Sequence, residues 1–253
     1  MDRLGDELYE ALRSRTTVDP LIARHPELTI ADAYHISRRI LARREADGET
    51  LIGKKIGVTS PAVQNMLGVH QPDFGYLTDA MVFSGQMPIS RLLIQPRAEG
   101  EIAFTLGADL VGPGVTPEQV LAATESVHAC FEVVDSRIRD WRIGIVDTVA
   151  DNASSGLFTV GAGVSPDGVD FENCHMTVHK NGAPLSEGRG RAALGSPLNA
   201  VAWLANTLGA FGVPLRAGEI ILSGSLVPLE PVVAGDHMHV HVSGIGATEV
   251  VFT

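Results

Sequence analysis

The stretch QPRAEGEIAFTL, residues 95–106, decides the interpretation of the chain, because it places two carboxylates in an extended and largely apolar run. Side chains on a β-strand alternate between two faces, so Glu99 and Glu101 are predicted to project from the same face, about 7 Å apart. A third carboxylate, Glu132, follows in the apolar stretch CFEVVDS. Burying carboxylates in such surroundings costs free energy unless a cation or a hydrogen-bond network compensates them.

Two interpretations of these glutamates are open. Carboxylate oxygens suit Mg²⁺ or Mn²⁺, and three of them leave about half of an octahedral shell free for water and substrate oxygens. Alternatively, the strand face is exposed, with Glu99 and Glu101 in solvent. The E-x-E spacing alone favours the exposed face. The working hypothesis is nevertheless a divalent metal held by Glu99, Glu101 and Glu132, since all three have apolar neighbours.

The bulk composition excludes several classes of protein. The chain has 253 residues, of which 45% are hydrophobic, so it can bury a sizeable core. Its net charge of −11 opposes binding to nucleic acid or anionic lipid. The amphipathic N-terminus lacks signal-peptide features, and no apolar run approaches the ~18 residues of a membrane span. We therefore expect a cytoplasmic protein, with Cys130 and Cys174 as buried thiols.

Hydrophobic periodicity predicts an α+β fold with a helical N-terminal part and a β-rich body. Helices are expected at residues 2–14 and from Thr29, where Thr29 and Asp32 resemble a capping box, to about Gly48. The sequence pattern changes near residue 50 from helical periodicity to short apolar runs, but no linker stands out. The chain is therefore expected to form a single domain, residues 1–253, with a helical part at 1–50 and a catalytic body at 51–253.

Short apolar runs punctuated by Gly and Pro predict the elements of the body. Strands are expected at about 52–58, 99–106, 130–135, 157–161, 175–180, 219–223 and 237–252, the last of which can be two strands. One helix is expected to open at Thr116-Pro117 and to extend to Val127, and another to open at Ser196-Pro197.

Lys55 is the first candidate for proton transfer or anion binding. In GKKIGVTS, residues 53–60, a strand would put Lys55 on one face with Gly57 and Thr59, which leaves room for a ligand beside an ammonium group. A surface lysine at a strand edge is the simpler alternative. The cluster His237, His239 and His241 also lines one strand face, but an ordinary half-exposed strand is the favoured interpretation.

Two polar stretches could contribute further groups. HQPDFGYL, residues 70–77, is expected to be a loop that holds Asp73, and VDTVADNASSG, residues 146–156, contains Ser154. Asp and Asn residues cap and turn the backbone more often than they catalyse, so turn chemistry is the alternative for both stretches. Arg137 and Arg139 in SRIRDW are expected to pair with nearby acids.

Together, these stretches resemble the 2-hydroxypentadienoate (2-oxopent-4-enoate) hydratases of aromatic meta-cleavage pathways, in the fumarylacetoacetate hydrolase superfamily. GKKIGVTS, GVHQPDFGYL, QPRAEGEIAF, FEVVDSRIRDW, VDTVADNASSG, SPLNAVAWLAN and GEIILSG occur in this order. Their number and order are typical of the branch that contains the hydratases and 4-oxalocrotonate decarboxylases. The resemblance implies a mixed β-rich fold, a bound Mg²⁺ or Mn²⁺, and a homo-oligomer.

The resemblance also implies roles for individual residues. The metal carboxylates fall on Glu99, Glu101 and Glu132, the motif lysine on Lys55, and the loop aspartate on Asp73. The serine of the polar run, expected to bind substrate, falls on Ser154, and Lys55 and Asp73 are the expected catalytic residues. The His-Glu pair that activates water in the hydrolase branch has no counterpart here, which argues against C–C bond hydrolysis.

The implied reaction is hydration of a 2-hydroxy-2,4-dienoate to a 4-hydroxy-2-oxo acid through an enolate, which a Lewis acid stabilises. Decarboxylation of a 2-oxo dicarboxylate is the nearest alternative and would need a further anion site. A non-catalytic partner of a sister pathway enzyme, or a module that only binds a keto acid, is a third possibility. The presence of Lys55 and all three glutamates argues against this third group.

Overall fold

The computed structural model describes residues 1–253, apart from the side chains of Ala62 and Leu67. The strands are β1 Leu51–Gly57, β2 Asp73–Thr78, β3 Gly85–Met87, β4 Arg97–Leu106, β5 Thr124–Val134, β6 Ser155–Val160, β7 His175–Lys180, β8 Ala183–Arg189, β9 Ile220–Leu222, β10 Glu230–Pro231, β11 His237–Val242 and β12 Gly246–Phe252. The α-helices are α1 Asp2–Ser14, α2 Leu21–Arg24, α3 Ile30–Ala46, α4 Pro61–Leu67, α5 Ile89–Leu92, α6 Pro117–Ala123, α7 Ile145–Ala150 and α8 Pro197–Gly209. Short 3₁₀ turns are η1 Asp79–Met81, η2 Arg139–Trp141, η3 Asn152–Ser154 and η4 Gly190–Ala192.

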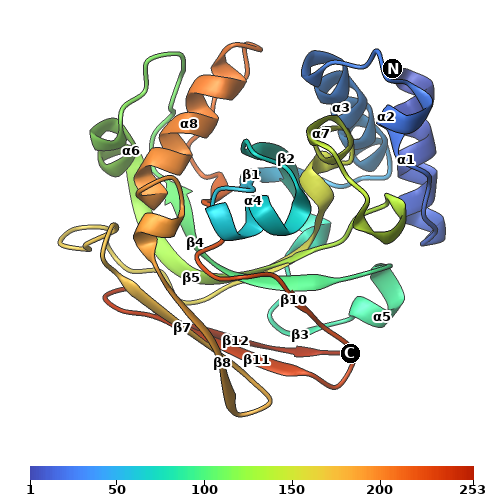
Figure 1. Ribbon diagram of the computed structural model, residues 1–253. Helices are drawn as coiled ribbons and strands as arrows, with labels where there is room; N and C mark the ends of the chain where they lie inside the picture. Colours follow the sequence, from blue (N-terminus) through green and yellow to red (C-terminus); the bar gives the residue numbers. More distant parts are fainter.

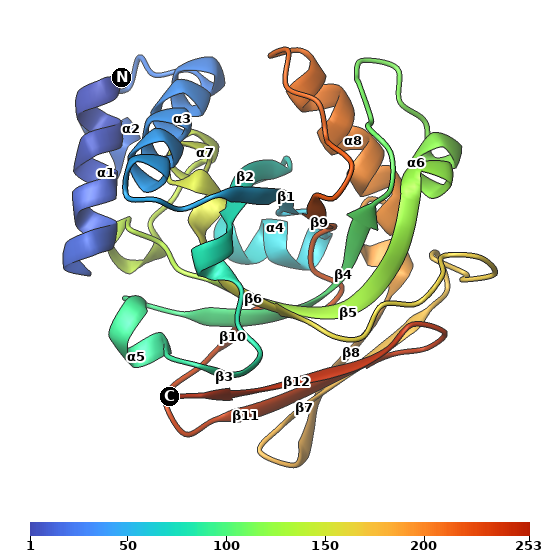
Figure 2. The ribbon, with the colours of Figure 1, turned by 180° about the vertical axis from the view of Figure 1, so that it is seen from behind.

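Two stacked β-sheets and a layer of helices form the molecule (Figure 1). The larger sheet has the order β2-β1-β9-β4-β5-β6, with β10 paired to β4, and the smaller sheet has the order β3-β12-β11-β7-β8. Apart from the short helix α5, which lies beside β3, the helices lie over one face of the larger sheet, and the smaller sheet lies against the other face, as both views show (Figures 1 and 2). This arrangement confirms the expected α+β fold with mixed sheets.

The central strand β4 is buried on both faces, which explains its sequence. Ile102 and Phe104 belong to the main core, while Ala103, on the opposite face, packs in a second cluster with Cys130 and Leu222. Gly100 lies between the two glutamates and faces the smaller sheet. A Cβ at Gly100 would lie 2.6 Å from the sulfur of Met176, so a glycine is needed for the sheets to approach this closely.

The N-terminal helices cover one end of the larger sheet. Helices α1 and α3 pack against each other, and α3 packs against α7. The predicted capping box at Thr29 is confirmed, since Thr29 Oγ1 accepts from the Asp32 N–H while the Asp32 carboxylate accepts from the Thr29 N–H. No helix in the described part of the chain combines the length and the apolar character needed to cross a membrane. Cys130 and Cys174 are buried free thiols, as expected.

Two predicted elements were wrong. The helix that opens at Thr116 ends at Ala123, and β5 begins at Thr124. Val127 pairs with Phe104 on β4, so the sheet ladder takes precedence over the helical spacing. Residues 70–77 were expected to form a loop, but Asp73 begins β2. In that strand Gly75 is needed because a Cβ there would lie 2.4 Å from the carbonyl oxygen of Asn152.

Candidate functional site

The three glutamates meet on the helix-covered face of the larger sheet. Glu99 and Glu132 are direct neighbours across β4 and β5, and Glu101 lies opposite Cys130. One carboxylate oxygen from each glutamate lies within 4.8 Å of the others. Their exposed fractions are 5% for Glu99, 0% for Glu101 and 1% for Glu132. The solvent-exposed interpretation of this strand face is therefore wrong, because the face is covered by other elements.

Several oxygens of this carboxylate triad, Glu99, Glu101 and Glu132, lack partners. Glu101 Oε2 accepts from the Gly224 N–H at 2.8 Å, and the Lys55 ammonium lies 3.3 Å from Glu132 Oε1, but Glu101 Oε1 and Glu132 Oε2 have no hydrogen-bond donor among the described residues. Buried polar atoms are nearly always satisfied in folded proteins. Hard oxygen atoms that converge with part of their hydrogen-bonding capacity unused are the ligand set that a divalent cation of the Mg²⁺ type prefers. The residues present fit such an ion.

The environment of the triad favours its protonated form when no cation is bound. Burial, followed by the charge of Glu132, raises the pKa of Glu99 to about 8. Burial and the same neighbour raise the pKa of Glu101 well above its ordinary value. The pKa of Glu132 is raised by burial as well, although Lys55 opposes the shift. A cation that binds here must therefore displace protons.

Metal affinity is expected to rise with pH as the pH approaches about 8, the pKa of Glu99 in the metal-free protein. Each displaced proton contributes up to about tenfold in affinity per pH unit. Because these pKa values lie above the ordinary value of 4.5, ionisation destabilises the fold, and the metal-free protein should lose stability as pH rises from 4.5 through about 8. Titration calorimetry with Mg²⁺ and thermal unfolding at a series of pH values measure the two effects. An affinity independent of pH below the Glu99 pKa would contradict this expectation.

Lys55 and Asp73 face each other at the end of the β1–β2 ladder. Gly57 pairs with Asp73 in that ladder, and Lys55 and Asp73 are each 2% exposed. A Cβ built on Gly57 would lie 2.3 Å from Asp73 Oδ1 and 3.0 Å from Lys55 Nζ. The space beside Gly57 is thus filled by an ammonium group and a carboxylate, and the surface-lysine alternative for Lys55 is wrong.

The ammonium group of Lys55 also joins this pair to the triad. Lys55 Nζ lies 3.3 Å from Glu132 Oε1. Burial by itself lowers the pKa of Lys55, but the carboxylates of Glu132 and Asp73 outweigh it and hold the pKa above its ordinary value. The neighbouring Lys54 occupies the opposite strand face and pairs with Glu219 at 2.5 Å. Of these two buried lysines, only Lys55 contacts the triad.

One pocket brings four of the candidate residues together, namely Lys55, Asp73, Glu99 and Ser154. Ser154 Oγ is buried and, like Asp73 Oδ1, has no hydrogen-bond partner among the described residues. The pocket is lined by Lys55, Gly57, Val58, Val63, Asp73, Glu99, Val134, Trp141, Ile143, Thr148, Ala153, Ser154 and Leu229. The lining thus combines carboxylates and an ammonium group with aliphatic side chains and Trp141.

The family profile described as Fumarylacetoacetate (FAA) hydrolase C-terminal matches residues 58–253. The chain belongs to the fumarylacetoacetate hydrolase superfamily. It is 58% identical over 253 residues to a 2-hydroxyhexa-2,4-dienoate hydratase of Comamonas testosteroni, with 98% of this chain and 96% of the relative covered. It is 68% identical over 216 residues to a 2-hydroxypent-2,4-dienoate hydratase of Pseudomonas putida, with 84% of this chain and 97% of the relative covered. These similarities place it in the branch of hydratases and 4-oxalocrotonate decarboxylases.

Solved structures agree with this placement. The 4-oxalocrotonate decarboxylase from Pseudomonas putida G7, complexed with magnesium and adipate, has a TM-score of 0.94 and 35% identity, with 100% of this chain and 97% of that chain covered. The fumarylpyruvate hydrolase from Pseudomonas aeruginosa has a TM-score of 0.62 at 14% identity, with 80% and 89% covered, and shares the fold alone. In the present chain, the loop that carries Ser154 has unusual geometry.

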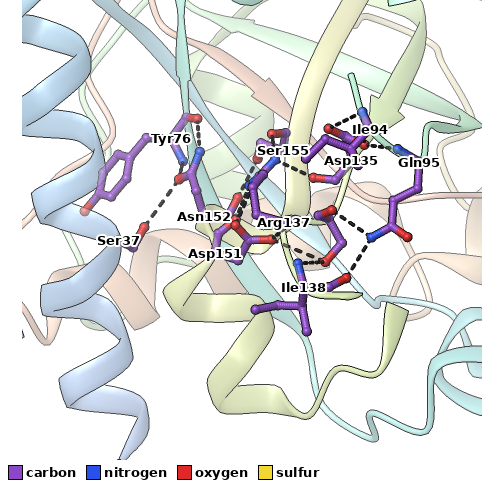
Figure 3. A network of polar contacts seen from close by, with 11 residues as sticks. Ser37, Tyr76, Ile94, Gln95, Asp135, Arg137, Ile138, Asp151, Asn152 and Ser155 are labelled. Carbon is purple, nitrogen blue, oxygen red and sulfur yellow. Dashed lines mark hydrogen bonds and ion pairs between the residues drawn. The ribbon is translucent and has the colours of Figure 1, made fainter. Parts of the chain in front are cut away.

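Asn152, Ala153 and Ser154 have consecutive φ angles of 55°, 51° and 52°. Left-handed conformations of residues other than glycine cost about 1–3 kcal/mol each and persist only where the surroundings enforce them. The amide of Asn152 provides part of that enforcement, because it accepts from the Tyr76 N–H at 2.7 Å and donates to the Tyr76 carbonyl at 2.9 Å (Figure 3). The strained turn is thereby fastened to β2, beside Asp73.

A buried ion pair between Arg137 and Asp151 holds the other side of the turn. Arg137 Nε donates to Asp151 Oδ1 at 2.6 Å, and its guanidinium also reaches the Ser155 carbonyl at 2.9 Å (Figure 3). Asp135 accepts from the Gln95 N–H at 2.7 Å, which ties this network to the segment before β4. The expected local pairing is confirmed for Arg137, whereas Arg139 pairs at 3.2 Å with Asp19, which is distant in the sequence.

Arg137→Met is expected to destabilise the protein by roughly 3–5 kcal/mol, because it leaves the buried carboxylate of Asp151 without a cation. Urea unfolding measures the loss. Arg139→Met is the matched control, since the Arg139 and Asp19 side chains are 51% and 58% exposed, and exposed pairs contribute about 0–1 kcal/mol. Equal midpoints for the two variants would show that the network does not hold the turn.

The sequence did not single out every group at the site. Thr148 lines the pocket, and Gly224 donates to Glu101, but neither lies in a pattern that spacing could identify. The histidines His237, His239 and His241 lie on β11 in the smaller sheet and are not among the residues that line the pocket.

Proposed function

We propose that this protein is a metal-dependent hydro-lyase that adds water to a 2-hydroxy-2,4-dienoate to give a 4-hydroxy-2-oxo acid. The observation that carries the proposal is that Lys55, Asp73 and Ser154 line one pocket together with Glu99, a member of the buried triad. The names of the similar hydratases support the same substrate class.

Glu99, Glu101 and Glu132 would hold the divalent cation, Mg²⁺ or Mn²⁺. When bound, such a cation supplies a Lewis acid that stabilises developing negative charge by several kcal/mol. The magnesium complex named for the similar decarboxylase supports this part of the proposal. The triad has no second role in the proposed mechanism, since it offers buried oxygens that lie within 4.8 Å of one another.

Proton movement is assigned to Lys55 and Asp73. Ketonisation of the dienoate moves the 2-hydroxyl proton to C5, and hydration then adds the water oxygen at C4 and a proton at C3. Asp73 Oδ1 is free within the pocket and can accept and return a proton, while the Lys55 ammonium neutralises substrate charge and can donate one. A placed acid–base group contributes roughly 10²–10⁴ in rate. Ser154 Oγ is assigned to substrate hydrogen bonding.

The far wall of the pocket favours hydration over decarboxylation. Val63, Val134 and Leu229 form an apolar cluster against which Trp141 packs. Lys55 is the only basic residue among those that line the described pocket, and it already contacts Glu132. A second substrate carboxylate would therefore meet apolar surface, where an unpaired charge is costly. A monocarboxylate with an uncharged tail fits this wall.

Steady-state assays with a panel of 2-hydroxydienoates and with a 2-oxo dicarboxylate, each with and without Mg²⁺ or Mn²⁺, test the proposal. We expect metal-dependent formation of a 4-hydroxy-2-oxo acid from the monocarboxylates. Release of CO₂ from the dicarboxylate without hydration would favour the decarboxylase. Absence of turnover with every substrate, despite metal binding, would identify a binding or partner subunit.

The proposal also covers the whole chain as one catalytic unit, residues 1–253, that forms a homo-oligomer. The single catalytic unit is supported by α3, which contributes to the network beneath the site: Ser37 Oγ donates to the Asn152 side chain at 3.4 Å (Figure 3). Light scattering of the purified chain measures the oligomeric state, and a single cooperative unfolding transition is the expected behaviour of one unit.

A further inference from the structure

Thr148, on α7, lines the pocket and is 1% exposed, and its hydroxyl donates to Asp73 Oδ2. We infer that Thr148 is a positioning residue that holds the Asp73 carboxylate in the orientation needed for proton transfer. This inference rests on the proposed function, because it gives Thr148 a role in the same reaction. It concerns a residue that touches Asp73 rather than the triad.

The two oxygens of Asp73 have different surroundings. Oδ2 accepts the Thr148 hydroxyl, whereas Oδ1 has no hydrogen-bond partner among the described residues and lies beside Gly57 and Lys55. The terminal torsion of an aspartate is broad and roughly two-fold, so the side chain by itself does not fix which oxygen faces the pocket. The donor at Oδ2 fixes it, and leaves Oδ1 as the oxygen available to exchange a proton.

Helix α7 is held firmly enough to place the donor. Asp147, next to Thr148, accepts from the Leu21 N–H at 2.6 Å and from the Gly144 N–H at 2.9 Å, which fastens α7 to α2 and to its own N-terminus. Asp151, one residue beyond α7, is paired with Arg137. Charged groups thus anchor α7 on both sides of Thr148.

The direction of the Thr148 hydroxyl is informative. Threonine in a helix often turns its hydroxyl to the carbonyl four residues earlier, which here belongs to Gly144. The Gly144 carbonyl accepts the Thr148 N–H at 3.0 Å, but the hydroxyl donates to Asp73 instead. A valine at this position would keep the β-branched shape and lose only the donor.

Thr148→Val and Thr148→Ser, each with intact Asp73 and with Asp73→Ala, test the inference. We expect Thr148→Val to lower kcat roughly 10- to 100-fold, the effect of losing one hydrogen bond to a charged group, with KM and Mn²⁺ affinity little changed. Thr148→Ser should recover most of the lost kcat. In the Asp73→Ala background, Thr148→Val should cause no further loss, because the bond no longer exists.

Thr124→Val is the matched control. The Thr124 hydroxyl is also buried, but it donates to the Val120 carbonyl at 2.7 Å, and Thr124 is not among the residues that line the pocket. Its kcat should match the wild type. An unchanged kcat in Thr148→Val, or equal losses with and without Asp73, would overturn the inference. Urea unfolding midpoints of the wild type, Thr148→Val, Asp73→Ala and the double variant measure the Thr148–Asp73 hydrogen bond without an activity assay. Additive changes in these midpoints would also overturn the inference. Lack of wild-type turnover with every dienoate instead removes the proposed function, which separates the two failures.

Discussion

Glu101→Gln is expected to remove both metal binding and turnover. The substitution keeps the size of the side chain and its hydrogen bond from the Gly224 N–H, but replaces a charged ligand by a neutral amide. Because a Lewis acid contributes several kcal/mol to such a reaction, and each 1.4 kcal/mol is tenfold, turnover should fall roughly 10³-fold or more. Calorimetric titration with Mn²⁺ and steady-state hydration measure the two losses.

Without metal, by contrast, Glu101→Gln should be more stable than the wild type. Burial and the charges of Glu132 and Glu99 raise the pKa of Glu101, so its carboxylate form destabilises the fold without metal. The metal-free variant should unfold at a higher temperature than the metal-free wild type, and Mn²⁺ should no longer raise that temperature. Glu219→Gln is the control, because Glu219 pairs with Lys54 outside the triad. Full metal-dependent turnover by Glu101→Gln would remove the ligand assignment.

Lys55→Met is expected to separate metal binding from chemistry. It keeps the apolar stem but removes the ammonium group that lies 3.3 Å from Glu132. We expect kcat to fall by roughly 10²–10⁴, the contribution of a placed acid–base group. Mn²⁺ binding should persist, because none of the three carboxylates is altered.

The neighbouring lysine provides the control for this variant. Lys54 is also buried and also ion-paired, but its partner is Glu219 and it faces the other side of β1. Lys54→Met should lower stability, because it leaves Glu219 without its cation, while turnover per folded molecule is retained. An unchanged kcat/KM in Lys55→Met, or an equal loss in Lys54→Met, would remove Lys55 from the mechanism.

Local sequence pattern predicted the elements whose signals are short-range. The capping residues Thr29, Thr116 and Ser196 each begin a helix at the expected position, since a cap depends only on the next few backbone N–H groups. Strand alternation likewise placed Glu99 and Glu101 on one face. The same reasoning failed at Thr124, where pairing with a distant strand decided the conformation.

The sequence by itself determined the residue types and their spacing: two glutamates on one strand face, a third in an apolar run, and a lysine among small neighbours. It left open whether that face meets water, because burial depends on elements far away in the chain. Only the tertiary structure decided that Glu99, Glu101 and Glu132 converge, that Lys55 reaches Glu132, and that Thr148 holds Asp73. The physical reason is that the free energy of a buried charge depends on all of its neighbours in space, and only folding brings these neighbours together.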